Sequence, residues 1–181
     1  MERVLKIGVR GGGRVGGALA HSWQRAGHDV AVSTRETVAE TAADADVVLL
    51  AVPATAAPDV LAAAGPLDGK VLVDATNNLS GGPDGAAIAA LAPAARAVKA
   101  FNTVFAPFFA EPPETRPTLV YAGDDSAAKE IVADLIREAG FEPVDAGDHS
   151  QAGDLEAFAR LVIGIAYRQG RGPFTYRFEP A

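Results

Sequence analysis

The 181-residue sequence predicts an α/β fold of the doubly wound type, with a mostly parallel sheet, a C-terminal helix and a short tail. Short apolar runs alternate with alanine-rich stretches of helical periodicity, the pattern of parallel strands covered by helices on both faces. A G-x-G-x-x-G string directly follows the first apolar run. With 49% apolar residues and this length, we expect one domain over 1–181, ending in a helix and tail at 148–181.

The apolar runs predict seven strands, and the stretches between them predict six helices. The strands are expected near residues 4–9, 28–33, 46–52, 70–74, 96–101, 118–122 and 141–145. The helices are expected near residues 14–26, 36–43, 54–64, 84–92, 125–139 and 150–168. Because few residues separate the second and third strands, the helix between them must be very short.

The glycine-rich string predicts a dinucleotide-binding, Rossmann-type loop between the first strand and the first helix. Gly11 would make the tight turn, Gly13 would let the backbone approach a pyrophosphate, and Gly16 would let the helix pack closely on the strand. Free N–H groups and the helix dipole favour an anion there. The alternative is a tight strand-to-helix turn without a ligand.

The end of the second strand favours NADP over NAD. NAD-selective sites usually carry Asp or Glu there to bind the ribose 2′-hydroxyl, whereas this strand ends in Ser33, Thr34 and Arg35. Two hydroxyls and a guanidinium suit a 2′-phosphate, with no carboxylate to repel it. Alternatively, Thr34 caps the next helix and Arg35 is a solvated surface charge.

Two loops at the carboxyl ends of the fourth and fifth strands are expected to line the nicotinamide half of the site, since ligands of doubly wound sheets bind outside that edge. Thr76 and Asn77 lie in the first loop, and the stretch 101–103 forms the second. The candidates for this pocket are Thr76, Asn77, Phe101, Asn102 and Thr103. The alternative is that Asn and Thr side chains only close the turns. Val52 and Pro53, after the third strand, belong to the same edge.

The last helix carries an apolar stripe, which we expect to bury against the sheet or against a second subunit. The stripe consists of Phe158, Leu161, Val162, Ile165 and Ala166. A homodimer is the favoured interpretation. Upstream of this helix, Asp145 and His149 could form an acid–base pair, but a turn followed by a helix N-terminus accounts for both.

Composition excludes several function classes. The net charge of −7 argues against nucleic acid or an anionic membrane as partner. The absence of cysteine excludes disulfides and thiolate sites, and His21, His28 and His149 lack metal-ligand spacing, so no metal site is predicted. No apolar run is long enough to span a bilayer and no signal core precedes the first strand, so we expect a cytoplasmic protein.

The ordered set of motifs resembles the NADP-binding oxidoreductases that use the deazaflavin coenzyme F420. The resemblance runs along nearly the whole chain. Its motifs are Lys6-Ile7-Gly8-Val9 with the glycine loop, Ala26-Gly27-His28 leading to Thr34-Arg35, residues 45–53, residues 69–77, Val98-Lys99-Ala100-Phe101-Asn102-Thr103, residues 122–125 and residues 140–147. The sequence departs from the family pattern at Arg10, at the shortened helix after Arg35 and at His149.

The resemblance implies that hydride passes between NADPH and a deazaflavin or flavin-like acceptor stacked in one cleft. It implies that Gly12, Gly13, Arg14 and Val15 hold the pyrophosphate. It also implies that Val52, Pro53, Asn77 and Ala100 lie against the ribose and nicotinamide. Because hydride transfer between two cofactors asks mainly for positioning in a dry cleft, no catalytic residue is expected. The alternatives are an NADPH-dependent reductase of a small organic or metal substrate and a non-catalytic NADP-binding sensor.

Overall fold

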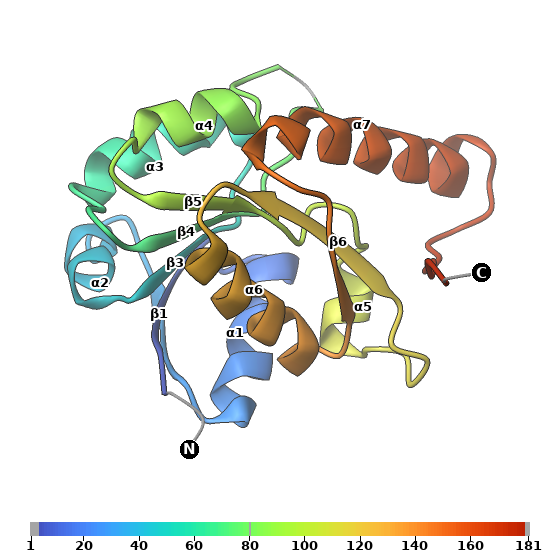
Figure 1. Ribbon diagram of the computed structural model, residues 1–181, viewed down its shortest axis with the longest axis horizontal. Helices are drawn as coiled ribbons and strands as arrows, with labels where there is room; N and C mark the ends of the chain where they lie inside the picture. Colours follow the sequence, from blue (N-terminus) through green and yellow to red (C-terminus); the bar gives the residue numbers. More distant parts are fainter. Residues whose placement is uncertain (1–3, 80, 180–181) are drawn as a thin grey trace.

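The computed structural model describes residues 4–79 and 81–179 and contains one seven-stranded sheet (Figure 1). The strands lie in the order β2-β1-β3-β4-β5-β6-β7. Their bounds are β1 Lys6–Arg10, β2 Asp29–Ser33, β3 Val47–Leu50, β4 Val71–Asp74, β5 Arg96–Lys99, β6 Thr118–Gly123 and β7 Glu142–Asp145. Every neighbouring pair is parallel except β5 and β6, which confirms the predicted mostly parallel, doubly wound sheet.

The strand order places a topological switch point at the carboxyl ends of β1 and β3. The chain leaves β1 toward β2 on one side and then returns across β1 to form β3 on the other. The loops that follow β1 and β3 therefore diverge, and a crevice opens between them.

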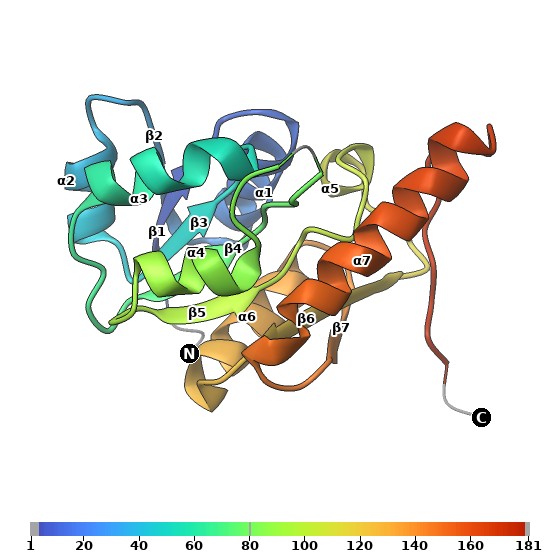
Figure 2. The ribbon, with the colours of Figure 1, turned by 90° about the horizontal axis from the view of Figure 1, so that it is seen from above.

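Helices cover both faces of the sheet (Figures 1 and 2). One face carries α1 (Arg14–Ala26), α5 (Pro107–Ala110) and α6 (Ser126–Glu138). The other face carries α2 (Val38–Asp44), α3 (Ala57–Ala64) and α4 (Gly85–Leu91). The last helix, α7 (Ala152–Ile163), packs beside α4 and against β6. It thereby extends the second layer over the far half of the sheet.

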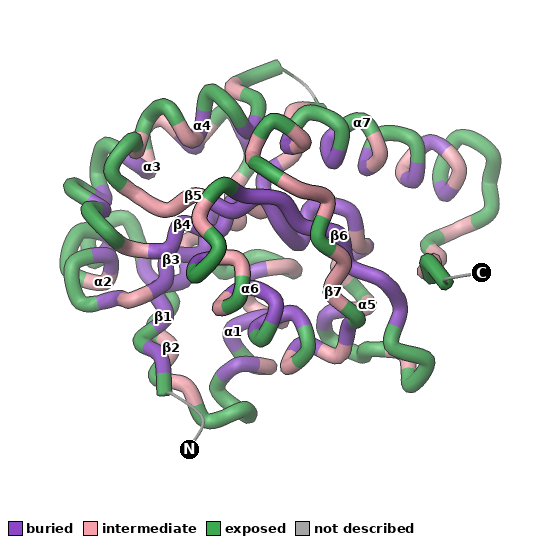
Figure 3. Tube along the Cα trace, viewed as in Figure 1, coloured by how far each residue is buried: buried purple, intermediate pink, exposed green. Residues whose placement is uncertain are grey.

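The central strands are buried on both faces, so alternate residues enter two separate cores (Figure 3). In β3, Val47 and Leu49 pack with α1 and α6, whereas Val48 and Leu50 pack with α2 and α3. Full burial of an aliphatic side chain contributes about 1.5–3 kcal/mol. This double burial explains why the strands appear in the sequence as continuous apolar runs.

The structure differs from the expected elements in three places. The region expected as one helix over 54–64 begins with a 3-10 turn, Ala54–Ala56, before α3. The short helix α5 was not expected; Pro107 stands in its first turn, where a missing N–H is harmless. The expected helix over 150–168 is a 3-10 turn at His149–Gln151, then α7, then a π-helical turn at Gly164–Arg168.

Within the described residues, no helix combines the length and the apolar composition needed to cross a membrane.

Candidate functional site

The glycine loop after β1 packs closely against the neighbouring backbone at Gly11 and Gly16 and faces open space at Gly13. Gly11 has φ +105°, and a Cβ there would overlap the carbonyl group of Ala51. A Cβ on Gly16 would overlap the Gly11 carbonyl oxygen, so α1 can approach the loop only with glycine at this position. Gly13, in contrast, has open space where a Cβ would stand. This is the position at which the sequence predicts that the backbone approaches a pyrophosphate.

The N-terminus of α1 offers unpaired backbone donors to an anion. Gly13 is the N-cap residue, no side chain caps the helix, and its first turn, which begins with Arg14 and Val15, contains no acidic residue. The first N–H groups of a helix lack intrahelical partners, and the helix dipole makes this end positive. The arrangement suits a phosphate-bearing ligand.

Two arginines share a cavity of about 490 Å³ on the side of the loop that faces α2 and α3. Arg35 follows β2, and Arg10 ends β1, where the parallel register sets it opposite Ser33. Apolar residues form most of the remaining wall: Val38, Val52, Pro53, Ala56, Val60 and Ala63, with Asp59 beside them. The cavity thus joins two cations to an apolar surface, a combination suited to an adenosine phosphate.

Arg10 is one site residue that the sequence did not predict, since it was noted only as a departure from a family pattern. One guanidinium nitrogen, Nη1, donates to the Ser33 carbonyl oxygen at 3.1 Å. Its Nε is buried and has no hydrogen-bond partner among the described residues. The available signal was its place as the last residue of β1, next to the end of β2.

The hydroxyl groups of Ser33 and Thr34 have protein partners. Ser33 is buried, and its Oγ donates to the Val9 carbonyl oxygen at 3.2 Å. The Thr34 hydroxyl donates to the Glu36 carboxylate at 2.7 Å. This hydrogen bond, more than the nearby Arg35 and Arg10 charges, lowers the pKa of the Glu36 carboxyl. The expectation of no carboxylate near Thr34 was therefore wrong, because the chain folds Glu36 back onto it.

At the far end of the carboxyl edge, a cavity of about 310 Å³ lies between the loops after β4 and β5 and helix α7. The loops contribute Asn77, Leu79, Asn102, Thr103, Val104, Phe105 and Ala106. Helix α7 and the turn after it contribute Ala159, Val162, Ile163 and Tyr167. We call this cavity the α7 cleft. Its wall is mostly apolar, and its polar side-chain groups come from the two asparagines and from the hydroxyls of Thr103 and Tyr167.

The two asparagines are hydrogen-bonded to each other and join the two loops. Asn77 Nδ2 donates to the Asn102 carbonyl oxygen at 2.8 Å, and Asn102 Nδ2 donates to Asn77 Oδ1 at 3.0 Å. The two loops that the sequence placed at the same edge of the sheet are therefore in direct contact, and their role in binding nicotinamide stays a prediction.

Three of the other residues named for this region have side chains outside the cleft. Ala100 is fully buried in the core, and Thr76 is 1% exposed. Phe101 has φ +64°, and its ring packs edge-on against Trp23 and Phe109. The left-handed backbone at Phe101 sends this ring into the core, while the next two residues line the cleft. These three residues can support the cleft but do not form its surface.

A buried ion-pair network beneath the cleft ties its floor to its wall. Lys99 Nζ lies 3.0 Å from Asp74 Oδ2 and 2.8 Å from Glu156 Oε1, and it donates to the Thr76 carbonyl oxygen at 2.7 Å. Glu156 belongs to α7, whereas Thr76 immediately precedes Asn77. All four side chains are less than about 3% exposed. The sequence analysis did not identify this network.

The remaining titratable candidates from the sequence do not line the α7 cleft or the arginine cavity. Asp145 binds Lys129 at 2.9 Å, and His149 Nε2 is paired with the Gly85 carbonyl oxygen at 3.1 Å, so each has its own partner. His28 is paired with Glu138. In the described part of the chain, no three His, Asp or Glu residues cluster as metal ligands would.

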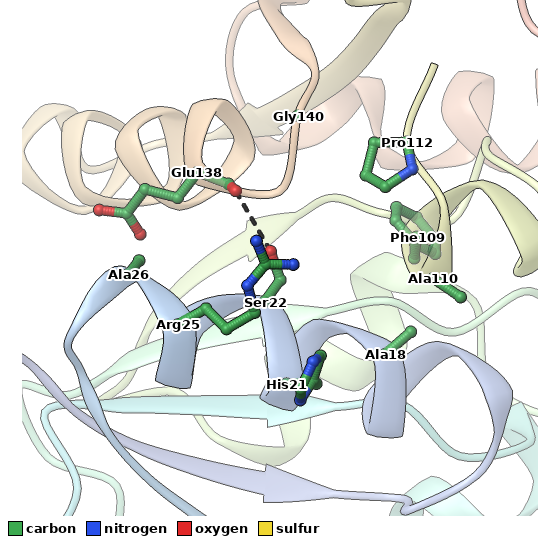
Figure 4. A pocket seen from close by; sticks show the side chains of 10 residues that line it. All are labelled: Ala18, His21, Ser22, Arg25, Ala26, Phe109, Ala110, Pro112, Glu138 and Gly140. Atoms are coloured by element: carbon green, nitrogen blue, oxygen red, sulfur yellow. Dashed lines mark hydrogen bonds between the residues drawn. The ribbon is translucent and has the colours of Figure 1, made fainter. Parts of the chain in front are cut away.

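Another cavity, of about 510 Å³, lies between α1, α5 and the turn after α6 (Figure 4). His21 and Arg25 stand on its α1 side, and Ser22 Oγ donates across it to the Glu138 carbonyl oxygen at 3.2 Å. None of its lining residues comes from the glycine loop or the α7 cleft. It is therefore separate from the glycine loop and from the α7 cleft.

Comparison with known proteins agrees with this geometry. Residues 6–78 match the model of the family described as NADP oxidoreductase, coenzyme F420-dependent. The rat metalloreductase STEAP3 is 30% identical over 180 residues, covering 87% of this chain and 37% of that protein. The chain therefore spans little more than a third of this curated relative.

Solved structures share the fold over most of the chain. A proposed F420-dependent NADP-reductase from Arthrobacter sp. FB24 is 27% identical, with a TM-score of 0.87 over 97% of this chain and 100% of that chain. A reductive aminase from Aspergillus terreus, solved with NADPH and ethyl-5-oxohexanoate, has a TM-score of 0.71 over 93% of this chain and 63% of that chain. At 20% identity, the aminase supports the fold alone.

Proposed function

We propose that this protein binds NADP(H) and transfers a hydride between it and a second small molecule. The premise is that residues 6–78 match the model of the family described as NADP oxidoreductase, coenzyme F420-dependent. The residues present fit the coenzyme. The cavity with Arg10 and Arg35 takes the adenosine 2′-phosphate, and the open space at Gly13 takes the pyrophosphate.

The observation that carries the proposal is the α7 cleft. A dinucleotide that starts over β2 and crosses the loop after β1 leads its nicotinamide toward the ends of β4 and β5. Asn77 and Asn102 stand there, and the cavity of about 310 Å³ beside them leaves room for another molecule. A protein that only sensed NADP would not need this space.

NADPH supplies the hydride, so the task of the protein is to position two molecules and to exclude water. Val162 and Ile163 of α7 provide an apolar wall, and Tyr167 stands at the end of the same helical segment. The buried Lys99 network holds this wall against the loop that carries Asn77. No residue of the cleft is required as a proton donor in this proposal.

We favour a deazaflavin such as coenzyme F420, or a flavin-like molecule, as the acceptor. The apolar walls suit a planar ring, and the surrounding segment suits an anionic tail. Residues 157–178 contain four arginines, Arg160, Arg168, Arg171 and Arg177, in a chain of net charge −7. Arg177 is paired with Glu179 at 3.5 Å, and the other three have no acidic residue between 157 and 178. Such a local excess of positive charge attracts an anionic substrate.

The likeness to a metalloreductase favours a second candidate, an NADPH-dependent reductase of a metal or small organic substrate. A panel of acceptors distinguishes the two: NADPH is mixed with the protein and with coenzyme F420, FMN, riboflavin or ferric citrate, and absorbance at the NADPH band is followed. We expect turnover with the deazaflavin or flavins that Gly13→Val abolishes. Turnover with ferric citrate alone would favour the second candidate, and tight NADPH binding without any turnover would favour a sensor.

We also propose a homodimer formed through the C-terminal segment. Of the large hydrophobic side chains that stay exposed in the described chain, Leu161, Tyr167 and Phe178 all belong to α7 or to the stretch after it. Val162 and Ala166 of the apolar stripe are instead buried within one chain. The exposed remainder of the stripe is the surface that a second copy would cover.

A further inference from the structure

The asparagine pair in the α7 cleft leaves one hydrogen-bond acceptor without a partner. Asn102 is 5% exposed, and its Oδ1 has no hydrogen-bond partner among the described residues. Buried polar atoms in folded proteins are nearly always paired, so an unpaired one in a cavity wall requires an explanation.

The hydrogen-bond network fixes which amide atom is unpaired. The backbone carbonyl oxygen of Asn102 can only accept, so the Asn77 atom that contacts it at 2.8 Å must be Nδ2. Asn77 Oδ1 is then an acceptor, and the Asn102 atom that contacts it at 3.0 Å must be Nδ2. Both amide orientations follow from this chain of donors and acceptors. The free atom is therefore an oxygen, and its missing partner is a donor.

No donor of the protein's own cleft wall reaches this oxygen. The wall carries two hydroxyl groups, on Thr103 and Tyr167, and neither donates to Asn102 Oδ1. The Thr103 hydroxyl instead contacts the Tyr176 hydroxyl at 2.7 Å, and the other α7 side chains of the wall, Ala159, Val162 and Ile163, are aliphatic. A molecule that enters the cleft can supply the donor.

We infer that Asn102 Oδ1 accepts a hydrogen bond from an N–H group of the ligand bound in the α7 cleft, and that this bond selects ligands that carry such a donor. The inference rests on the proposed function and names the recognition chemistry of its site. Two sources supply an N–H of this kind: the carboxamide of the nicotinamide, and the ring N3–H of a flavin or deazaflavin. A buried acceptor discriminates strongly, because an analogue without the donor leaves the oxygen unpaired.

The test uses pairs of ligands that differ only in the donor. The coenzyme arm compares the Kd of NADPH with that of reduced 3-acetylpyridine adenine dinucleotide phosphate, in which a methyl replaces the amide NH₂. The acceptor arm compares kcat/KM for riboflavin with that for 3-methylriboflavin. We expect the wild-type protein to discriminate about tenfold or more in one arm. That arm identifies the source of the donor.

Asn102→Leu should remove the discrimination in the arm where the wild-type protein shows it. The ratio measured in the other arm should stay as in the wild type. The matched control is Asn78→Leu, the same substitution in the neighbouring loop after β4, at a residue that donates to the Gly82 carbonyl oxygen at 2.8 Å and does not line the cleft. Asn78→Leu should keep the full discrimination.

Absence of discrimination in both arms by the wild-type protein would overturn the inference without reference to any variant, so it stays testable even if Asn102→Leu does not fold. Equal discrimination by wild type and a folded Asn102→Leu would also overturn it. The coenzyme arm measures binding alone. Failure of the proposed function would instead appear as absent NADPH binding, or as absent turnover with every acceptor.

Discussion

At the scale of single residues, preference between the two nicotinamide coenzymes depends on a balance of charges around the adenosine end. Arg35 and Arg10 line the same cavity, whereas Glu36 lies beside them on the Thr34 hydroxyl. Since hydrogen bonding lowers the pKa of the Glu36 carboxyl, this group stays negative throughout the neutral range. A 2′-phosphate in this cavity, where we propose it, would meet the two arginines, with the Asp59 carboxylate in the same wall and the Glu36 carboxylate beside it.

Arg35→Ala should weaken NADPH binding about tenfold or more and leave NADH binding nearly unchanged. The variant removes a charge-assisted pair to the 2′-phosphate, a group that NADH lacks. Fluorescence titration of both coenzymes measures the effect. Glu36→Gln should have the opposite effect. It should increase the affinity for NADPH and leave the affinity for NADH unchanged, because it removes a negative charge near the phosphate. Equal changes for both coenzymes in these variants would place the phosphate elsewhere.

Gly13→Val should abolish nucleotide binding in a protein that still folds. Its side chain would enter the open space in which we place the pyrophosphate, where no protein atom lies within 4 Å of the Cβ position. Circular dichroism measures whether the variant folds, and nucleotide titration measures whether it binds NADPH. Gly16→Val provides the contrast, since its Cβ overlaps the Gly11 carbonyl oxygen and should impair folding itself. Retained NADPH affinity in Gly13→Val would contradict the phosphate assignment.

At the scale of elements, helix α7 is held to the sheet by the Lys99 network. Lys99→Met should lower the free energy of unfolding by about 3–5 kcal/mol, because Asp74 and Glu156 would remain as buried carboxylates without their cation. Urea denaturation gives this value. The exposed pair Lys6 and Asp44 serves as the control, and Lys6→Met should change the free energy of unfolding far less than Lys99→Met, because water already solvates both groups. A similar small change at Lys99 would show that α7 does not depend on the network.

The C-terminal tail is attached to the cleft through Tyr176, and this attachment should be sensitive to alkaline pH. Burial raises the pKa of Tyr176 to about 12, partly opposed by its hydrogen bond to Thr103. The unfolded chain titrates near 10, so it loses this proton first. The stabilisation is complete below pH 10 and is lost as pH rises from 10 through about 12.

The measurement is urea denaturation of the wild type and of Tyr176→Phe at pH 8 and pH 11. We expect the stability advantage of the wild type to shrink at the higher pH. Tyr121, whose pKa burial also raises, is present in both proteins and cancels in the difference. A constant difference between the two proteins would mean that the Tyr176 hydroxyl is not buried in solution.

At the scale of the whole molecule, the proposed homodimer should dissociate when its apolar face is made polar. Leu161 is 58% exposed on α7, and Leu91, 47% exposed on α4, offers a matched leucine outside that face. We expect sedimentation velocity to give a dimer for the wild type and for Leu91→Asp, and a monomer for Leu161→Asp. Burying exposed aliphatic area drives such association. A wild type that sediments as one chain at micromolar concentration would contradict the proposal.

The sequence by itself determined the sheet and the first half of the site. All seven strands, the glycine loop and the position of Arg35 follow from local patterns, because a strand buried on both faces must be apolar and a tight phosphate loop must be glycine-rich. The family resemblance, confirmed over residues 6–78, added the order of the motifs. The roles of the site residues remain predictions.

Only the tertiary structure decided which side chains face the site. The register of β1 against β2 brings Arg10 beside the end of β2, and the packing of α7 brings Val162 and Ile163 to the loop that carries Asn102. Packing against Trp23 of α1 and Phe109 of α5 takes the Phe101 ring into the core, and Thr76 and Ala100 are buried as well. These outcomes depend on contacts between residues many positions apart and on the direction of each side chain. Local periodicity in the sequence contains no information on long-range contacts or on side-chain direction. The sequence pattern could therefore locate the site but could not determine which side chains line it.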